Sequence, residues 1–564
     1  VDAAVKINVP ESWKTLADDT KAPDASLPHY IREIQIPVNK QAGDAIPVSE
    51  FMPYADGVTP SETSKYEKRG IAVKVPQWIP ENCIGCNKCA LVCPHAAIRP
   101  FLLNAEEEAA KPATFVTKEA KGKGFEGLTF RMQVDPLDCQ GCGACANVCP
   151  AKEKALVMEL LDTQMPEQEN WEHALTLSTK TNPMDKFTVR GSQFERPLYE
   201  FSGACAGCGE APYMKLMSQL FGDRMFVTSA TGCAYVVGSS TPSFPYVANE
   251  KGHGPANSNS LFEDNAEYAL GMKLSIDQMR RQMAAHAEAV VASTSDAALK
   301  SALEAWLAEG DNGDKTRALS EAVVAALNAT AETSDDIAFL KANKDALPKK
   351  SVWMYGGDGW AYDIGFGGLD HVLASGADVN VLVVDTEVYS NTGGQASKAT
   401  QLGAVAQFAN GGKRTGKKDL GAIAMTYGNV YVAQVAMGAN EQHLITALKE
   451  AEAHHGPSIL IAYAPCINHG ISKGMSQAQL EEKLASECGY WPLWRYVPEL
   501  KAEGKNPFIL TSKEPNGQLL DFMMGETRFA SLTRTFPETA KVLFAEAEEF
   551  CAQRYAKYKH LAEQ

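Results

Sequence analysis

Eight of the 14 cysteines fall into two copies of a single pattern, and this repeat limits what the chain can fold into more than any other feature. Each copy reads C-x2-C-x2-C-x3-C-P. Thiols this closely spaced indicate either metal ligands or a disulfide framework. Zinc sites usually show two separated ligand pairs, so the spacing favours iron–sulfur clusters. A disulfide knot or a pair of zinc sites is the alternative.

The repeat resembles the ligand spacing of bacterial two-cluster ferredoxins, where the fourth cysteine of each run crosses to the other cluster. Small residues lie between the thiols and leave room for backbone N–H groups to approach the sulfurs; they are Gly85, Gly141, Gly143 and Ala144. On the crossing rule, one [4Fe–4S] cluster is held by Cys83, Cys86, Cys89 and Cys149, and the other by Cys93, Cys139, Cys142 and Cys145.

The charge balance excludes a general attraction to polyanions. The chain has 53 Lys and Arg against 69 Asp and Glu, a formal net charge of −16, so we expect no nucleic-acid partner. No apolar run reaches the ~18 residues that cross a bilayer, and the start lacks the layout of a signal peptide. We therefore expect a cytoplasmic protein without a membrane partner. Because the sequence starts at Val1, we also expect a processed product or the downstream part of a longer polypeptide.

The order of parts predicts two folded regions joined by linkers. Residues 1–75 are rich in proline and form an arm or linker. Residues 76–160 form a ferredoxin-like α+β domain with two clusters, and 161–200 form a second linker. Residues 201–564 alternate apolar runs with helical stretches, which predicts an α/β domain with a parallel sheet. The Ala-rich stretch 272–347 reads as two or three amphipathic helices inserted into this domain.

Five apolar runs are predicted as strands of this sheet, at 225–231, 352–356, 379–386, 421–428 and 458–465. In an open parallel sheet, ligands gather outside the carboxyl ends of the strands. Residues that follow the predicted strands are therefore the first candidates for a site.

A Gly-Asp-Gly sequence follows the second predicted strand and a threonine ends the third. This pair of features resembles the diphosphate motif of thiamine-diphosphate enzymes. On that comparison Asp358, Thr386 and the carbonyl of Val388 hold Mg²⁺, which prefers hard oxygen ligands, while Gly357 and Gly359 let the backbone approach phosphate. The alternative is an ordinary Gly-Asp-Gly turn after a strand.

A third set of thiols lies outside the repeat. Cys205 and Cys208 form a C-x2-C pair, Cys233 follows the first predicted strand and Cys466 follows the last. If these strands lie in one sheet, the four thiols share an edge with Asp358, which predicts a third [4Fe–4S] cluster beside the thiamine site. The alternative for Cys233 and Cys466 is a small buried apolar residue. The two remaining cysteines are expected to be structural or free; they are Cys488 and Cys551.

Several motifs together resemble the C-terminal half of the pyruvate:ferredoxin oxidoreductase family, over residues 76–480. They are ACAGCGE, ATGCAY, NSLFEDNAEYALGM, YGGDGWAYDIGFGGLDH and VDTEVYSNTGGQASKAT. The resemblance implies an anaerobic type of oxidative decarboxylation in which pyruvate and coenzyme A give acetyl-CoA and CO2. Electrons then pass singly through three [4Fe–4S] clusters to ferredoxin or flavodoxin. It also implies thiamine diphosphate and Mg²⁺ as cofactors and a homodimer of the full assembly.

The same resemblance assigns the cofactor contacts. It implies that Asn391 reaches the keto acid, where its amide can donate to developing oxyanion charge; the alternative is a turn-capping asparagine. The residues implied to contact thiamine diphosphate are Glu210, Cys233, Gly357, Asp358, Gly359, Trp360, Thr386, Glu387, Val388, Tyr389, Ser390 and Asn391.

The chain is about half as long as the single-chain members of this family. The groups that bind the aminopyrimidine, the substrate carboxylate and coenzyme A are missing, so we expect the chain to be inactive without an N-terminal half. A sister enzyme for another 2-oxoacid and a polyferredoxin electron carrier stay open as alternatives. The basic loop GGKRTGKK (411–418) is expected to be a solvated loop, and docking of anionic coenzyme A or of an acidic ferredoxin is the alternative. His253 and His469 are assigned no role.

Overall fold

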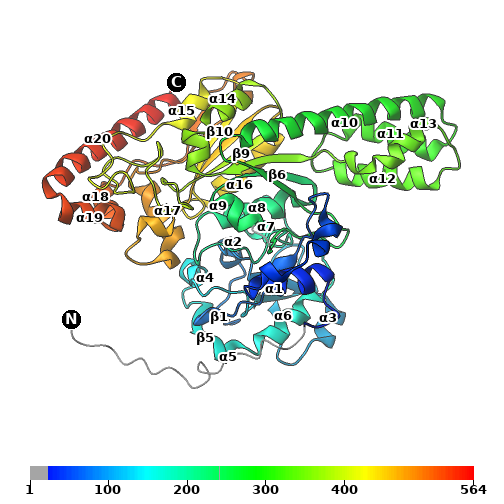
Figure 1. The fold of residues 1–564 in the computed structure, drawn as a ribbon, viewed down its shortest axis with the longest axis horizontal. Helices are drawn as coiled ribbons and strands as arrows, with labels where there is room; N and C mark the ends of the chain where they lie inside the picture. Colours follow the sequence, from blue (N-terminus) through cyan, green and yellow to red (C-terminus); the bar gives the residue numbers. More distant parts are fainter. Residues whose placement is uncertain (1–22, 240–241) are drawn as a thin grey trace.

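The computed structural model describes residues 23–239 and 242–564. The first 22 residues of the predicted N-terminal arm lie outside this described part. A cysteine-rich module (residues 74–160) lies below a larger domain built on an eight-stranded sheet, as Figure 1 shows. The remainder of the arm packs against the larger domain through Tyr30, Ile31 and Ile34, which contact Phe244.

The module consists of two small antiparallel sheets and short helices. Strands β1 (Lys74–Trp78) and β5 (Leu156–Leu160) pair with each other. Strand β4 (Thr129–Val134) pairs with β2 (Ile98–Leu103) and with β3 (Lys118–Glu119), which comes from the stretch between the two cysteine runs. The helices of this region are α2 (Lys88–Leu91), α3 (Ala105–Ala110), α4 (Ala144–Val148), α5 (Leu161–Gln164) and α6 (Glu167–Leu175).

The large sheet has the strand order β13-β12-β10-β11-β9-β8-β6-β7. The six strands from β10 to β7 in this order run parallel, whereas β12 and β13 add an antiparallel edge. The predicted α/β class is therefore confirmed. The strands are β6 (Met225–Ala230), β7 (Ala256–Ser260), β8 (Ser351–Gly356), β9 (Asn380–Asp385), β10 (Tyr431–Val435), β11 (Ser458–Tyr463), β12 (Trp494–Tyr496) and β13 (Phe508–Leu510).

One strand prediction is wrong. Residues 421–428 are mostly helical, because Asp419 caps helix α15 (Leu420–Met425) by accepting a hydrogen bond from the N–H of Ala422 at 2.9 Å. The strand at this place in the sheet is β10, which starts a few residues later. Gly421 packs directly on Trp494: a Cβ there would lie 2.6 Å from the indole. The apolar run is thus a helix face rather than a strand.

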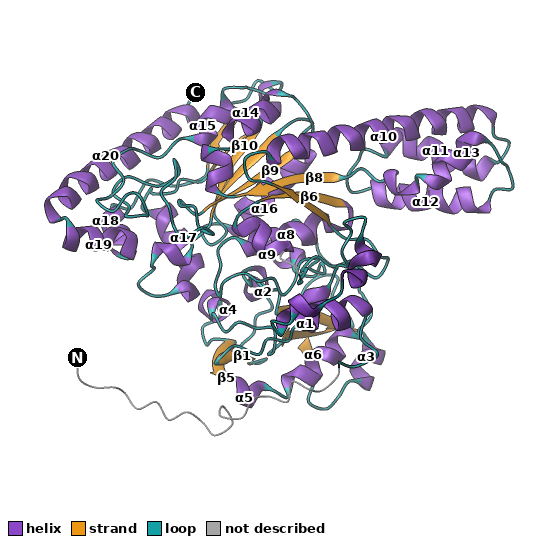
Figure 2. Ribbon diagram, in the orientation of Figure 1, coloured by secondary structure: helices purple, strands orange, loops and turns teal. Residues whose placement is uncertain are grey.

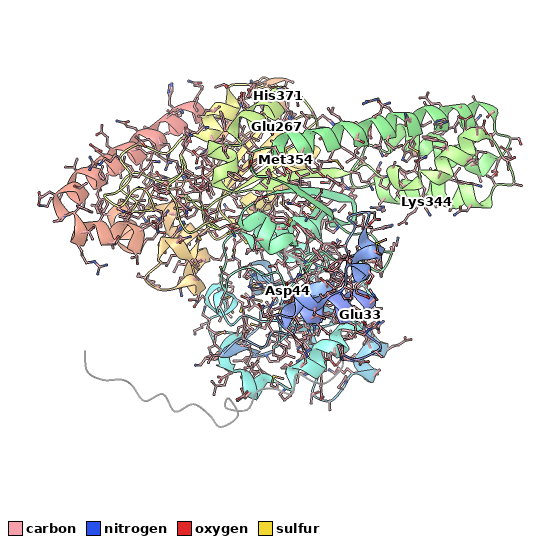
Figure 3. All side chains as sticks on the ribbon, viewed as in Figure 1. Glu33, Asp44, Glu267, Lys344, Met354 and His371 are labelled. Carbon is pink, nitrogen blue, oxygen red and sulfur yellow. The ribbon has the colours of Figure 1, made fainter. Side chains whose placement is uncertain are left out.

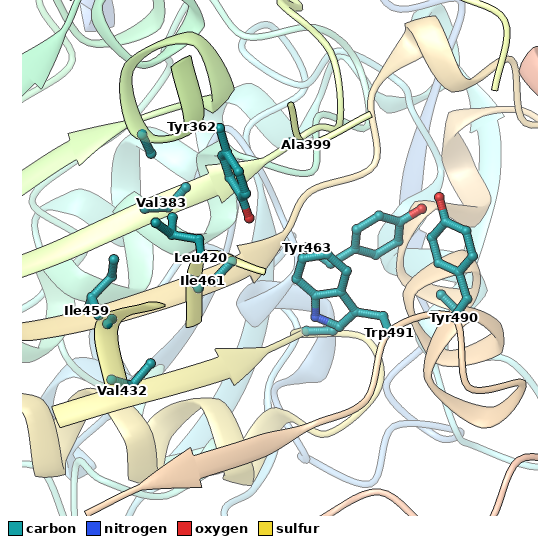
Figure 4. Packing of buried hydrophobic residues seen from close by; sticks show 14 of the residues in the cluster. Tyr362, Val383, Ala399, Leu420, Val432, Ile459, Ile461, Tyr463, Tyr490 and Trp491 are labelled. Carbon is teal, nitrogen blue, oxygen red and sulfur yellow. The ribbon is translucent and has the colours of Figure 1, made fainter. Parts of the chain in front are cut away.

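Both faces of the sheet are buried, as expected for parallel strands covered by helices. Alternate residues of each strand point to opposite faces; in β8, Met354 lies in one core and Tyr355 in the other. Figure 4 shows Val383, Val432 and Ile461 on the face that meets Leu420. Helices α14 (Phe366–Ala374), α15 and α20 (Pro537–Ala562) cover this face, and α8 (Ala211–Phe221) and α16 (Glu441–Ala453) cover the other.

Four helices, rather than two or three, extend away from the body as an arm (Figures 1 and 2). Its first helix starts before residue 272, at Asn265, and packs its first turns against α14; Figure 3 labels Glu267 there and Lys344 directly after the last helix. This arm of four helices has its own apolar core around Trp306. Its helices are α10 (Asn265–Ser293), α11 (Ala297–Glu309), α12 (Thr316–Ala329) and α13 (Asp335–Ala342).

The remaining helices connect the sheet to the site and to the C-terminus. They are α7 (Val189–Ser192), α9 (Cys233–Ser239), α17 (Ala478–Glu487), α18 (Leu519–Met524) and α19 (Thr527–Thr535), and one further helix, α1 (Ile36–Asn39), lies in the N-terminal arm. Within the two described ranges, no helix is both long and apolar enough to span a membrane.

Candidate functional site

The carboxyl ends of four neighbouring parallel strands present predicted site residues side by side. In the order β11-β9-β8-β6, the strands are followed by Cys466, Thr386, Asp358 and Cys233. Parallel strands end at the same edge, so the sheet itself brings these side chains together. Along this edge, the two oxygen-bearing residues Thr386 and Asp358 therefore lie between the two thiols, Cys466 and Cys233.

The Cys205–Cys208 loop completes a group of four thiols, the third thiol group (Cys205, Cys208, Cys233 and Cys466). The loop is held against the segment after β11, because the N–H of Gly209 donates to the carbonyl of Pro465 at 3.1 Å. Burial raises the pKa values of Cys208, Cys233 and Cys466, the last to about 11, and neighbouring thiols raise them further. Cys233 raises the pKa of Cys208, and Cys466 raises the pKa of Cys233. Cys205 in turn raises the pKa of Cys466. The structure thus gathers all four.

The eight thiols of the repeat also lie in two groups within the module. Burial raises the pKa of Cys89, and Cys86, Cys83 and Cys149 raise it further. Burial likewise raises the pKa of Cys145, and three further thiols raise it as well: Cys142, Cys139 and Cys93. We name the two sets the first thiol group (Cys83, Cys86, Cys89 and Cys149) and the second thiol group (Cys93, Cys139, Cys142 and Cys145).

All 14 cysteines are free thiols, so the disulfide alternative is not what the structure shows. Within residues 23–239 and 242–564, no three or more His, Cys, Asp or Glu side chains are arranged to hold a single metal ion. A four-iron cluster differs from such a site, because each thiolate binds its own iron at a corner of the cube.

A cavity of about 110 Å³ opens beside the third thiol group. Five of its lining residues were not predicted: Thr231, Gly232, Ala234, Phe262 and Thr392. The ATG sequence before Cys233 indicates Thr231 and Gly232. Phe262 follows β7, a polar edge strand that apolar periodicity does not reveal. The predicted residues in its lining are Glu210, Cys233, Gly357, Asp358, Gly359, Trp360, Val388, Tyr389, Ser390 and Asn391.

The floor of the cavity is shaped by a glycine. A Cβ at Gly359 would lie 2.2 Å from the ring of Tyr389, so no other residue fits there without moving that ring. Gly359 begins a helical turn that starts directly after Asp358. The ring of Tyr389 therefore packs directly on the backbone at this point, which only glycine permits.

The three predicted oxygen ligands lie in contact with one another. The N–H of Thr386 donates to Oδ1 of Asp358 at 3.1 Å, and the Thr386 hydroxyl donates to the carbonyl of Val388 at 3.0 Å. Ser397 donates to the other Asp358 oxygen at 3.1 Å. Burial and then Asp385 raise the pKa of Asp358 well above its usual range. Since neither hydrogen-bond donor is charged, the oxygen set fits a divalent cation such as Mg²⁺.

Thr386 and Glu387 do not line the cavity, unlike Val388. The φ of Glu387, +61°, is rare for a residue other than glycine, and its buried carboxylate pairs with Lys417 at 3.2 Å and with Arg528 at 2.8 Å. Burial opposes ionisation, but these two cations hold the pKa of Glu387 at about 2. Lys417 also pairs with Asp385 at 2.7 Å. These contacts hold the strained backbone beside Thr386.

The sequence predicts that the basic loop 411–418 is solvated, but the structure buries part of it. Lys417 is buried in the network beneath the site, and Lys413 donates to the carbonyl of Ser397 at 2.6 Å. Lys418 lies over the ring of Phe366 and donates to the carbonyl of Tyr362. Arg414 remains exposed.

Ser390 links the cavity to the third thiol group. Its hydroxyl lies 3.3 Å from Sγ of Cys233 and 3.5 Å from Oε1 of Glu210. Burial raises the pKa of Glu210 to about 7, so its carboxyl group exchanges a proton near neutral pH. Asn391 is exposed at the mouth of the cavity, and its amide lies close enough to Cys233 to lower the pKa of that thiol.

Comparison with known proteins identifies three matched segments. The family described as a 4Fe-4S dicluster domain matches residues 80–152, and the C-terminal TPP-binding domain of thiamine pyrophosphate enzymes matches residues 322–462. A domain of unknown function matches residues 18–72. The first match covers the cysteine repeat, and the second covers Asp358, Thr386 and Val388, whereas the third thiol group lies outside both.

Relatives resemble the whole chain. It is 55% identical to pyruvate:ferredoxin oxidoreductase of Moorella thermoacetica and 53% identical to a pyruvate-flavodoxin oxidoreductase of Klebsiella pneumoniae, over 100% and 99% of this chain and 48% and 47% of those proteins. It is 44% identical to the mitochondrial pyruvate dehydrogenase [NADP(+)] of Euglena gracilis, over 100% of this chain and 31% of that protein. The chain thus spans about half the length of the first two curated relatives.

Proposed function

From the premise that this chain belongs to the pyruvate:ferredoxin oxidoreductase family and corresponds to its C-terminal half, we propose that it carries the cofactor and electron-transfer centres of that enzyme. The full reaction is the oxidative decarboxylation of pyruvate with coenzyme A to acetyl-CoA and CO2. The observation that carries the proposal is the shared sheet edge, which sets four thiols beside the cavity that holds Asp358.

We assign the diphosphate end of thiamine diphosphate to this cavity. Asp358, Thr386 and the carbonyl of Val388 would hold Mg²⁺, and the backbone of Gly359, which lines the cavity, would lie against phosphate. When bound, the cofactor supplies the carbanion chemistry of decarboxylation. The cavity is lined by Asn391, whose amide we assign to orienting the keto acid and stabilising negative charge on its oxygen.

The three thiol groups suit a route for single electrons through three [4Fe–4S] clusters. The third group borders the cavity, and the N–H of Gly207, between two of its cysteines, hydrogen-bonds Cys142 of the second group. The first group lies farther out, next to Ile84, which is 66% exposed. Electrons would therefore leave the cavity through the third group, pass the second and reach ferredoxin or flavodoxin from the first.

The chain supplies only part of such an enzyme. We propose that an N-terminal half provides the groups that bind coenzyme A, the aminopyrimidine and the substrate carboxylate, because the relatives are about twice as long. We further propose that the full assembly is a homodimer in the cytoplasm, where reducing conditions keep cluster thiols free.

Cofactor content of the full-length protein tests the proposal. We expect about twelve irons per chain from three four-iron clusters, together with one thiamine diphosphate. A content of eight irons per chain would contradict the third cluster. The absence of thiamine diphosphate would indicate that the protein is only an electron carrier. Asp358→Asn should abolish Mg²⁺-dependent cofactor binding but keep the iron, and Asp370→Asn in helix α14 is the matched control. Turnover of another 2-oxoacid in preference to pyruvate would instead indicate a sister enzyme.

A further inference from the structure

Lys215 is a fully buried lysine that joins the two folded regions. It lies on α8, one turn after Ala211, the first residue of that helix, which directly follows Glu210 of the cavity. The side chain is 1% exposed. Its Nζ donates to the carbonyl of Ala90 and, at 2.9 Å, to that of Leu91. The ammonium group of the large domain thus contacts the first cysteine run of the module, between Cys89 and Cys93.

The charge of Lys215 has no carboxylate to balance it within the described residues, since both its hydrogen-bond partners are backbone carbonyls. Besides the thiols, the charged side chain that acts on it is Arg99, another cation, and Arg99 is already paired with Glu200. Lysine is almost never fully buried without a partner, because leaving water costs an isolated charge several kcal/mol. Some other negative charge must compensate for it.

Cysteines of two thiol groups surround the ammonium. Burial lowers the pKa of Lys215 to about 8, whereas Cys93 of the second group and Cys89 of the first raise it. Four thiolates give a bound [4Fe–4S] cluster a net negative charge, and each electron accepted adds another. Two such clusters would supply the missing compensation on both sides of Lys215.

We propose that Lys215 raises the reduction potentials of the two clusters in the cysteine-rich module, so that both accept electrons from the cluster beside the cavity. This inference rests on the proposed function. A fixed positive charge stabilises the reduced cluster more than the oxidised cluster, because the reduced form carries more negative charge, and low effective dielectric strengthens the effect. The step transfers one electron and moves no proton.

Redox titration followed by electron paramagnetic resonance on the full-length enzyme tests the proposal. In Lys215→Met, which keeps the apolar stem, the midpoint potentials of both module clusters should shift to lower values, and the third cluster should shift less. Lys215→Arg should restore the wild-type potentials. Lys88→Met is the matched control: Lys88 starts α2 in the same loop but is 34% exposed and paired with Glu441, so its removal should shift the potentials less.

A merely structural lysine that caps the end of α2 would leave the potentials unchanged. Lys215→Gln separates the two roles, because its amide can still donate to a carbonyl but carries no charge. Unchanged potentials in the Met and Gln variants would overturn the inference. If both neutral variants fold but lose the module clusters, retention by Lys215→Arg supports charge compensation, and loss in that variant as well overturns it. A wild-type enzyme without cluster signals would instead contradict the proposed function.

Discussion

The Nε2 atom of His469 lies 2.7 Å from the carbonyl oxygen of Thr386, a contact between the loop after β11 and the end of β9. Burial and the nearby Arg528 lower the pKa of His469 to about 3, so its imidazole is neutral near physiological pH. A carbonyl can only accept, which places the proton on Nε2. A histidine without an expected role therefore holds the backbone of a predicted Mg²⁺ ligand.

His469→Leu should weaken Mg²⁺-dependent thiamine diphosphate binding by about fivefold, since the lost hydrogen bond is worth roughly 1 kcal/mol. His469→Gln can still donate and should recover part of the affinity. Calorimetric titration of the full-length enzyme measures both. The exposed His371 on α14, labelled in Figure 3, gives the control His371→Gln. Wild-type affinity in His469→Leu would contradict this role.

Gly359→Ala should abolish cofactor binding, because the new methyl group would lie 2.2 Å from the Tyr389 ring and push it into the cavity. Gly367→Ala provides a matched control in α14, where a Cβ meets nothing within 4 Å. That change should be neutral or stabilise the protein by up to about 1 kcal/mol. Cofactor titration and thermal unfolding distinguish the two. Normal binding by Gly359→Ala would show that the diphosphate does not lie there.

Lys417→Met should lower the free energy of unfolding by about 3–5 kcal/mol, because Asp385 would remain buried without its cation and Glu387 would keep only Arg528. Arg414→Met, in the same loop but exposed, should change it by less than about 0.5 kcal/mol. Denaturant titration of both variants checks this. Equal stabilities would mean that the buried network contributes nothing.

The stability of the protein should depend on the ionisation of Glu482. Burial raises its pKa from the ordinary 4.5 to about 8. Below pH 4.5 the group is protonated in the folded and unfolded states alike. As pH rises from 4.5 to 8, only the unfolded state loses the proton, so the wild type loses stability on the order of a few kcal/mol and the loss levels off above pH 8.

Glu482→Gln cannot ionise, so its advantage over wild type should grow with pH through this window. Its side-chain oxygen can keep the 2.8 Å hydrogen bond from the N–H of Gly438. Thermal unfolding from about pH 5.5 to about pH 8.5 measures the difference. Glu487→Gln, an exposed change on the same helix α17, should show no such trend; a constant difference for Glu482→Gln would contradict the assignment.

The parts predictable from sequence are those in which local spacing fixes the chemistry. The cysteine repeat fixes eight thiols by spacing alone, and the positions of Asp358 and Cys466 follow from apolar runs that end just before them. A pattern of apolar residues in the sequence cannot reveal β7, because Ala256–Ser260 is a mostly polar edge strand. The run at 421–428 misled because its capping residue, Asp419, lies outside it.

The support beneath the site could not be predicted, because it depends on packing between segments far apart in the chain. Arg528 belongs to helix α19 but pairs with Glu387 after β9. Lys417 belongs to a loop whose composition is typical of a solvated surface, yet it lies in the core. Only the folded sheet places these charges together.

The third thiol group draws its members from a loop before β6, the start of α9 and the loop after β11. Its sulfurs meet only when nearly the whole large domain has folded, whereas the eight thiols of the module come from one short stretch of chain. We therefore expect an order of assembly: iron can enter the module early, whereas the proposed third cluster can be inserted only last, into a scaffold that is already built.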